Sequence, residues 1–365
     1  MNGVEVAVVG AGITGLAVAR EVRDRGRSVA VLERDGIAAG ASGVQPGGVR
    51  QQWGTRIACR LARESVAFWR EVDERLAARV PLALRSGGYL FAAEGEAALA
   101  GLEANVALQN EEGIRSRIVG PAEAADLVPG LVADAIAGGA WLGEDGYFDR
   151  PQAVVEAFAQ GLDVRRADVG DLRRDGSGWR AGPVTADAVV VAAGVDTPAL
   201  LATLGIELPI EAESRYLFFS DPIRERLLEP LVVAAERGFA AKQLADGRVL
   251  ASDLSARGDA EAGRERWRAT IRAASESLLP QLEHVSYPLL VHGAYDVTPD
   301  HQPILGPVDE GLFVAAGFSG HGFMIAPAVA RITADAVEGR HDPALDLLGA
   351  GRFAAGRLVS ESQLV

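Results

Sequence analysis

The sequence predicts an α/β fold in which a parallel sheet flanked by helices is interrupted by an inserted α+β part. A strand, a helix and a second strand open the chain over residues 4–9, 13–25 and 28–33, as in a βαβ unit. Short apolar runs that suit buried parallel strands return only later, at residues 187–192 and 312–316. We therefore expect one domain made of three segments, with a second domain inserted in two pieces.

Composition and charge narrow the class of protein. The chain has 365 residues, 48% of them hydrophobic, which is enough for two domains or one large α/β unit. Its formal net charge is −14 without a basic cluster, which argues against a nucleic-acid partner. No apolar run is long enough to span a membrane, and strand-like residues begin at Val4, where a signal peptide would lie. Cys59 is the single cysteine, so no internal disulfide or thiolate metal cluster can form, and we expect a cytoplasmic location.

The first strand-to-helix turn carries a glycine motif. Gly10, Gly12 and Gly15 permit a tight turn and close approach of a pyrophosphate to the helix N-terminus, which favours anions. Glu33 ends the second strand, where its carboxylate can accept hydrogen bonds from ribose hydroxyls. Together these residues predict a dinucleotide site, without distinguishing FAD from NAD.

The middle of the chain mixes helices with short strands. Apolar residues recur at helical spacing from Ile57 to Leu76 and from Trp267 to Leu278. The Asp246–Gly247 pair is typical of a hairpin turn. Strand-like runs on both sides of this turn and before it predict an antiparallel sheet, over residues 89–92, 215–220, 232–235, 239–243 and 248–252.

A second glycine-rich turn lies near the carboxyl end. The run from Gly317 to Gly322 follows the strand at 312–316 and precedes a helix expected to end near Val337, with Pro327 in its early turns. In a flavoprotein, such a helix N-terminus can stabilise negative charge on the reduced ring. The alternative is a packing turn at the end of a sheet.

Five segments, in order and spread over nearly the whole chain, resemble one family. They are AVVGAGITGLAVAREVRDRGRSVAVLERD, GASG…GGVRQQW, VVVAAGVDTPAL, AYDVTPDHQPILGP and AAGFSGHGFMIAPAV. With them the chain resembles the D-amino-acid-oxidase superfamily of FAD-dependent oxidoreductases. Within it, the likeness is to the group of the sarcosine oxidase β subunit, dimethylglycine dehydrogenase and dye-linked L-proline dehydrogenase.

The resemblance implies a fold and an activity. A Rossmann-like FAD-binding domain would comprise residues 1–45, 145–205 and 294–365, and an α+β substrate-binding domain with an antiparallel sheet would comprise residues 46–144 and 206–293. The reaction would oxidise the C–N bond of an amino acid or a secondary or N-methyl amine. A hydride would pass from the α-carbon to flavin N5, leaving an imine that hydrolyses. Oxygen or another acceptor would then take the electrons, and a partner subunit or homo-oligomer is possible.

The resemblance also implies which residues hold FAD. They are expected to contact the ADP half, the diphosphate and both ends of the flavin ring. The set is Gly10, Gly12, Ile13, Thr14, Gly15, Glu33, Arg34, Ser42, Gly43, Gly47, Gly48, Val49, Arg50, Val169, Ala193, Gly194, Gly320, His321, Gly322, Phe323 and Met324.

Three positions depart from the pattern of the single-chain sarcosine oxidases. Gly293 occupies the neighbourhood of the cysteine that binds their flavin covalently, so we expect non-covalent FAD. Met324 stands where they have a lysine that binds the substrate carboxylate, and Trp53 stands near the position of a missing arginine. A carboxylate must therefore be recognised by other residues, if at all.

Four residues are the catalytic candidates: Arg50, Lys242, Tyr295 and His321. Arg50 could hold a carboxylate or polarise the flavin, or could form a surface ion pair. His321 could bond the flavin or keep the amine neutral, or could cap its own loop. Tyr295 suits an aromatic substrate wall, or core packing.

Lys242 is the only lysine in an otherwise arginine-based chain. It could anchor substrate or assist reoxidation, or could be an exposed bystander. Arg215 is an alternative carboxylate anchor, and Asp300 is expected to cap a turn. His284, His292, His301 and His341 lack metal-ligand spacing, so no metal is expected.

Two other functions stay open from the sequence. One is an NAD-dependent dehydrogenase. The other is a flavin-binding assembly factor or electron-transfer subunit without turnover of its own. A single cysteine leaves the chain without ligands for an iron–sulfur relay.

Overall fold

The computed structural model describes residues 3–363, and its first sheet is built from distant segments of the chain. Its parallel strands form the order β19-β12-β1-β2-β9. Antiparallel β18 extends one side, and the hairpin β10–β11 pairs with the start of β12. The strands are β1 (Gly3–Val9), β2 (Val29–Glu33), β9 (Asp163–Arg166), β10 (Leu172–Asp175), β11 (Gly178–Ala181), β12 (Val184–Val191), β18 (Ile304–Asp309) and β19 (Leu312–Ala316).

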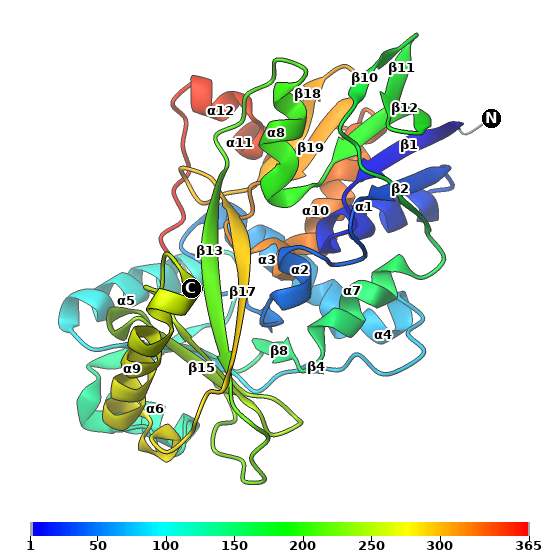
Figure 1. Ribbon diagram of the computed structural model, residues 1–365. Helices are drawn as coiled ribbons and strands as arrows, with labels where there is room; N and C mark the ends of the chain where they lie inside the picture. The colour runs from blue at the N-terminus through cyan, green and yellow to red at the C-terminus, as the bar shows by residue number, and fades with distance from the viewer. Residues whose placement is uncertain (1–2, 364–365) are drawn as a thin grey trace.

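Helices cover this sheet and complete its hydrophobic core. α1 packs on α10, and α10 packs in turn on α3 (Figure 1). The fully buried side chains of Val8 on β1, Leu16 on α1 and Val329 on α10 belong to this core. The helices of this part are α1 (Ile13–Asp24), α2 (Ala41–Val44), α3 (Arg56–Arg70), α4 (Val72–Arg75), α7 (Pro151–Ala159), α8 (Thr197–Ala202), α10 (Gly322–Val337), α11 (Ala344–Leu348) and α12 (Gly351–Ala354).

The second large sheet forms the inserted part, in the lower half of Figure 1. Its order is β17-β13-β16-β15-β14-β5-β7-β6. The strands are β5 (Tyr89–Ala93), β6 (Arg117–Val119), β7 (Gly138–Leu142), β13 (Glu211–Phe219), β14 (Leu231–Ala234), β15 (Phe239–Gln243), β16 (Val249–Asp253) and β17 (Leu289–Val297). The helices are α5 (Glu96–Glu111), α6 (Pro121–Leu127) and α9 (Ala260–Leu278), and α9 packs on β16.

Short elements link the two parts. A small sheet joins β3 (Gly48–Val49), β8 (Gly146–Phe148) and β4 (Leu84–Arg85) in the order β3-β8-β4. The long ribbon β13–β17 runs from one part to the other (Figure 1). Four 3-10 turns lie at Ala133–Ala135, Gly194–Asp196, Ala235–Arg237 and Pro280–Leu282.

The predicted fold class is confirmed, with three local differences. The inserted sheet is not purely antiparallel, because β14 pairs with β5 in parallel. The helical stretch from Ile57 to Leu76 is divided, since Glu71 has non-helical backbone angles between α3 and α4. The domain limits remain a prediction, and the limit at 293/294 falls inside β17.

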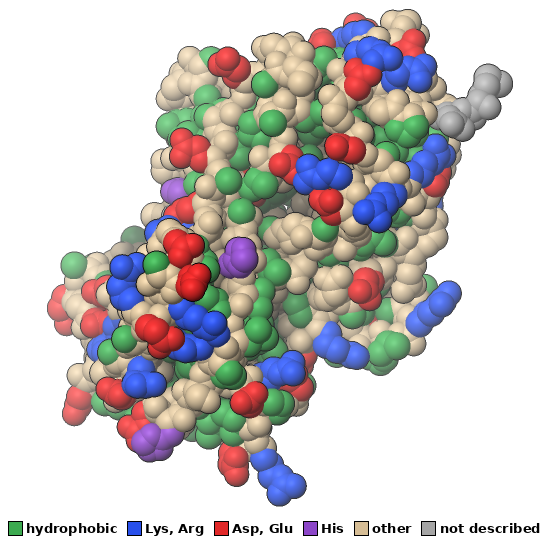
Figure 2. Space-filling model, viewed as in Figure 1, with side chains coloured by type: hydrophobic (Ala, Val, Ile, Leu, Met, Phe, Trp, Pro, Cys, Tyr) green, Lys and Arg blue, Asp and Glu red, His purple; other side chains and the backbone are tan. Residues whose placement is uncertain are grey.

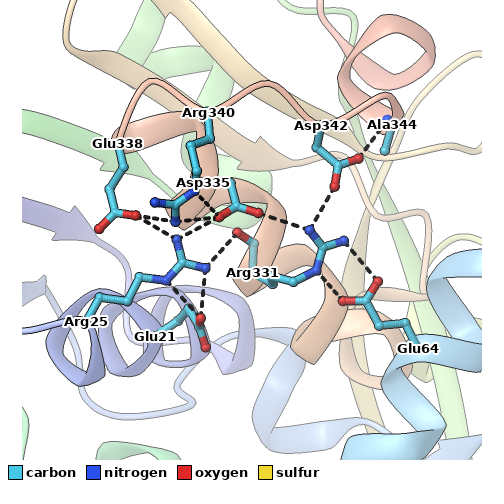
Figure 3. Close-up of polar contacts among 9 residues, drawn as sticks. All are labelled: Glu21, Arg25, Glu64, Arg331, Asp335, Glu338, Arg340, Asp342 and Ala344. Carbon is cyan, nitrogen blue, oxygen red and sulfur yellow. Dashed lines mark hydrogen bonds and ion pairs between the residues drawn. The ribbon is translucent and has the colours of Figure 1, made fainter.

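An ion-pair network joins three helices on the surface (Figure 3). Arg25, directly after α1, contacts Asp335 of α10 at 2.8 Å, and Arg331 of α10 contacts Glu64 of α3 at 2.5 Å. Further members are Glu21, Glu338, Arg340 and Asp342. Elsewhere, acidic and basic side chains are interspersed over the viewed face (Figure 2).

Candidate active site

The first glycine turn brings β1, α1 and β12 into close contact. Gly10 has φ of 107°, and a Cβ there would lie 2.3 Å from the carbonyl oxygen of Ala192. A Cβ on Gly15 would lie 2.1 Å from the carbonyl oxygen of Gly10. Any side chain at either position would displace backbone, so the turn that exposes the N-terminus of α1 depends on glycine.

A cavity of about 1340 Å³ lies over this turn. Twelve of the predicted cofactor residues line it: Gly10, Gly12, Ile13, Thr14, Glu33, Arg34, Ser42, Ala193, Gly194, Gly320, Gly322 and Phe323. The other predicted residues are outside its lining: Gly15, Gly43, Gly47, Gly48, Val49, Arg50, Val169, His321 and Met324. The cavity therefore joins the two glycine-rich turns, which are about 300 residues apart in the sequence.

Glu33 and Ser42 organise one end of this cavity. The Glu33 carboxylate accepts hydrogen bonds from the backbone N–H of Ala11 and of Asp35, each at 2.8 Å. The Ser42 hydroxyl accepts one from the N–H of Ile13, the first residue of α1, at 3.0 Å. A carboxylate and a helix N-terminus thus face the same cavity, as a dinucleotide requires.

A second cavity of about 750 Å³ adjoins the first. The two share four lining residues: Ala41, Gln45, Ala294 and Tyr295. One wall of the second cavity is the inner face of the inserted sheet, and the other is the segment around Pro46. We call this second cavity the chamber.

Lys242 lines the chamber and is fully buried. Its Nζ donates a hydrogen bond to the carbonyl oxygen of Pro46 and lies 4.0 Å from the centre of the Tyr147 ring. Burial lowers the pKa of Lys242 to about 7, because no carboxylate contacts the ammonium closely enough to offset desolvation. The expectation of an exposed Lys242 is therefore wrong, and its role in the site stays a prediction.

Tyr295 forms the boundary between the two cavities. A Cβ on Gly320 would lie 2.3 Å from its ring, so this glycine lets the second glycine turn pack on the tyrosine. The guanidinium of Arg215 lies 5.0 Å from the ring centre and forms an ion pair with Glu213 at 2.7 Å. Glu213 also pairs with Arg257, so one carboxylate is shared by two guanidinium groups and Arg215 remains an alternative carboxylate anchor.

Arg50 and His321 both contact the Trp53 ring. The buried Arg50 guanidinium stacks 3.6 Å from the Trp53 ring and donates to the carbonyl oxygens of Gln52 and Gln363. The ring centre of His321 lies 4.2 Å from that of Trp53, and its Nε2 has no hydrogen-bond partner among the described residues. Burial, and then the charge of Arg50, hold the pKa of His321 well below its ordinary value. Within residues 3–363, neither side chain is part of the lining of the two cavities, and the surface ion pair considered for Arg50 is wrong.

Two buried carboxyl groups were missed by sequence reasoning. Asp296 accepts a hydrogen bond from the N–H of Gly317 at 2.7 Å and so ties β17 to the second glycine turn. Asp145 accepts one from the N–H of Gln51 at 3.0 Å. Burial raises the pKa of Asp296 to about 6 and that of Asp145 to about 7. The only sequence signals for Asp296 were the AYDVTPD segment that contains it and the second glycine-rich turn.

The family match decides what this architecture holds. Residues 5–336 match the family described as FAD dependent oxidoreductase (DAO). This chain belongs to that family. It is therefore an enzyme that uses FAD, and the NAD and non-catalytic alternatives lose their support.

Several relatives align with this FAD-dependent oxidoreductase over almost its whole length. Glycine oxidase of Geobacillus kaustophilus is 28% identical, over 94% of this chain and 95% of its own. Sarcosine oxidase subunit beta of Rhodobacter capsulatus is 25% identical, over 98% and 90%. The structure of L-proline dehydrogenase from P. horikoshii superimposes with a TM-score of 0.87 at 25% identity, over 97% and 99%.

The residues of this FAD-dependent oxidoreductase fit their cofactor. Two glycines whose side chains would block the turn, the free N-terminus of α1 and the Glu33 carboxylate suit the pyrophosphate and a ribose. The N-terminus of α10 faces the other end of the same cavity, where it can favour negative charge.

The departures noted in the sequence have structural counterparts. Gly293 lines the chamber, where a Cβ would lie 2.5 Å from a methyl of Val44. The carbonyl oxygen of Met324 accepts a hydrogen bond from the Trp69 indole at 2.8 Å. Cys59 is buried in α3, and burial raises the pKa of its thiol to about 12.

Residues 3–363 contain neither a metal-ligand cluster nor a membrane-spanning helix. Within residues 3–363, no group of three or more His, Cys, Asp and Glu side chains is arranged to hold a metal ion. The described helices include none long and apolar enough to cross a membrane. Asp300 is a structural residue, since its buried carboxylate pairs with Arg352 at 2.8 Å.

Proposed function

We propose that this enzyme oxidises the C–N bond of an amino acid or of a secondary or N-methyl amine. The observation that carries the proposal is a chamber with a buried cation, placed directly beside the cofactor cavity at Tyr295. The printed names of the relatives, a glycine oxidase, a sarcosine oxidase subunit and an L-proline dehydrogenase, support the same substrate class.

When bound, FAD supplies a two-electron acceptor for the hydride that leaves the carbon next to nitrogen, and the resulting imine hydrolyses. Glu33 would bond the adenosine ribose, and the N-terminus of α1 would face the diphosphate. Val169, outside the cavity lining, would contact the adenine only through backbone. The turn from Gly320 to Met324 would cap one end of the flavin ring.

The chain's own side chains orient the substrate and exclude water. Lys242 would hold a carboxylate through its Nζ, or assist reoxidation if the carboxylate lies elsewhere. Tyr295 would form the wall against which the reacting carbon is placed. Apolar residues around them keep water away from the amine, so that it can bind in its neutral form.

Arg50 and His321 would act from outside the lining of the two cavities, where both contact Trp53. The fixed charge of Arg50 favours negative charge that develops near the second glycine turn. His321 is kept neutral by burial and by Arg50, and its Nε2 is free among the described residues to bond a group placed beside the turn.

We also infer that FAD is held without a covalent bond. Gly293 supplies no nucleophile, and the Cys59 thiol is buried with a raised pKa. Acid precipitation should leave the yellow colour in the supernatant, whereas colour in the pellet would overturn this inference. The electron acceptor would be oxygen or another small carrier. A partner subunit or a homo-oligomer is compatible with the relative that is named as a β subunit. A cytoplasmic location suits a chain with a single thiol.

The test is an anaerobic screen of the holoenzyme. Amino acids and N-methyl amines are added while the visible absorbance of the flavin is followed. We expect bleaching by members of this class and not by 2-hydroxy acids of matched carbon skeleton. If only the hydroxy acids bleached the flavin, the proposed oxidation of a C–N bond would give way to oxidation of a C–O bond.

A further inference from the structure

The neighbouring strands β15 and β16 of the inserted sheet place one cation in an apolar surface. Lys242 of β15 lies opposite Leu250 of β16, and Ala240 lies opposite Ser252. All four line the chamber. Since side chains alternate across a strand, Ala240 and Lys242 lie on the same face of the sheet. Lys242 is therefore set beside a leucine on the chamber face of the sheet.

Strands β13 and β17 continue this surface, and the charged side chain that they add to the chamber lining, Arg215, is ion-paired. Leu217 of β13 lies opposite Val291 of β17, and Arg215 lies opposite Gly293. These residues also line the chamber, and Arg215 is engaged by Glu213. The apolar side thus extends from Leu250 to Val291 and is closed by Leu231 and Leu254.

The lining of the chamber suits an apolar side chain better than it suits the smallest amino acids. Most of the residues that line it are apolar, among them Leu217, Leu231, Leu250, Leu254 and Val291. A glycine or sarcosine molecule would leave the leucine wall without a partner. A larger apolar side chain would remove that wall from water, which is favourable in proportion to the area covered.

We propose that the chamber selects amino acids, free or N-alkylated, with an apolar side chain larger than methyl. Lys242 binds the carboxylate, and Leu217, Leu231, Leu250, Leu254 and Val291 contact the side chain. This inference rests on the proposed function, and it names the substrates that this site prefers.

The test compares substrates in anaerobic single turnovers of the holoenzyme. Glycine, sarcosine, alanine, leucine and phenylalanine are used, both enantiomers where they exist, together with N-methyl-leucine. We expect the second-order rate constant of flavin bleaching to be about tenfold or more higher for leucine or phenylalanine than for glycine. Glycine or sarcosine reacting as well as these substrates would overturn the inference and leave the proposed function intact. Bleaching by none of the compounds would refute the proposed function itself, and the inference with it.

Two substitutions test the wall directly. Leu250→Phe narrows the chamber beside Lys242, and Leu254→Trp narrows it at a half-buried position that accepts a large side chain more readily. Each should lower the leucine-to-glycine ratio of rate constants by about tenfold. Leu99→Phe, on α5 and outside the chamber lining, is the matched control. FAD content and thermal unfolding verify folding, and an unchanged ratio in both correctly folded chamber variants would exclude this wall from substrate selection.

Discussion

The Glu33 carboxylate has one backbone partner in the first glycine turn and one just after β2. It accepts the N–H groups of Ala11 and Asp35, so it both shapes the turn and faces the cofactor cavity. We predict that Glu33→Gln weakens FAD binding roughly tenfold to a hundredfold, the effect of losing a charge-assisted hydrogen bond. Titration of apoenzyme with FAD measures this. An altered substrate profile with full flavin occupancy would mean that Glu33 lies near the reacting ring instead.

Arg50 is a buried cation that contacts Trp53, and Trp53 contacts His321 of the second glycine turn. Arg50→Met keeps an apolar stem on Trp53 but removes the charge. We predict that flavin reduction slows roughly tenfold to a hundredfold in single turnovers. Arg56→Met, at the exposed start of α3, is the matched control and should reduce at the parent rate. If Arg50→Met also reduces at the parent rate while it retains FAD, Arg50 has only a structural role.

Lys242 gives the site a pH dependence with a defined sign. Its pKa of about 7 means that the ammonium, which attracts carboxylates, is lost as the pH rises through 7. We predict that 4-methylpentanoate, a carboxylate without an amine, inhibits more weakly above this pH. The inhibition constant should increase roughly fivefold from pH 7 to pH 8.

The matched variant is Lys242→Met. It should bind 4-methylpentanoate weakly and with little change between pH 6 and pH 8, because no titrating ammonium remains. A parent enzyme whose inhibition constant also stays flat over this range would place the carboxylate away from Lys242. Measuring flavin reduction and reoxidation separately in the same variant distinguishes substrate anchoring from a role in reoxidation.

At the residue scale, the sequence predicts what depends on local spacing. Gly10 and Glu33 are recognisable because one turn and the following strand place them together. Asp145 and Asp296 are not recognisable in this way. Their burial, and hence their raised pKa values, arises from contacts with Gln51 and with Gly317, which lie in other segments.

At the scale of elements, periodicity identifies most helices and strands but not every pairing. The strand at 239–243 and its hairpin with β16 are found as predicted, because the Asp246–Gly247 turn lies between the two strands. The parallel pairing of β14 with β5 joins segments about 140 residues apart, and no local pattern encodes it. The break at Glu71 likewise interrupts a stretch whose apolar spacing is continuous.

The network of Figure 3 connects elements that the sequence keeps apart. Arg331 pairs with Glu64 of α3, with Asp335 and with Asp342. We predict that Arg331→Gln lowers the free energy of unfolding by about 1 kcal/mol, near the upper end for exposed pairs, because Glu64 and Asp342 lose this partner while Asp335 keeps Arg25 and Arg340. Urea unfolding at low and high salt measures this.

A local pair provides the comparison for that prediction. Arg180 contacts Asp175 across the β10–β11 hairpin at 2.8 Å, with both side chains partly exposed. Arg180→Gln should change the free energy of unfolding by less than about 0.5 kcal/mol. Equal effects of the two substitutions, or an effect of Arg331→Gln that is the same in high salt, would show that the network adds no stability as a network.

At the scale of the whole molecule, the active site exists because two parts of the chain meet. The cofactor cavity belongs to the first sheet, the chamber belongs to the inserted sheet, and Tyr295 on the ribbon between them borders both. Sequence motifs predict the first part well, since glycine turns are local. The chamber wall draws residues from six strands, so its composition becomes visible only in three dimensions.

The central claim is that this enzyme removes two electrons from a C–N bond in that chamber. An anaerobic single turnover of the holoenzyme with one equivalent of its best acyclic amino-acid substrate tests this most directly, with the flavin absorbance and the released products measured on the same sample. We predict that bleaching is accompanied by one equivalent of 2-oxo acid and one of ammonia, or of alkylamine from an N-alkyl substrate, per FAD. Bleaching without release of an amine, or an amine substrate recovered unchanged, would contradict the account.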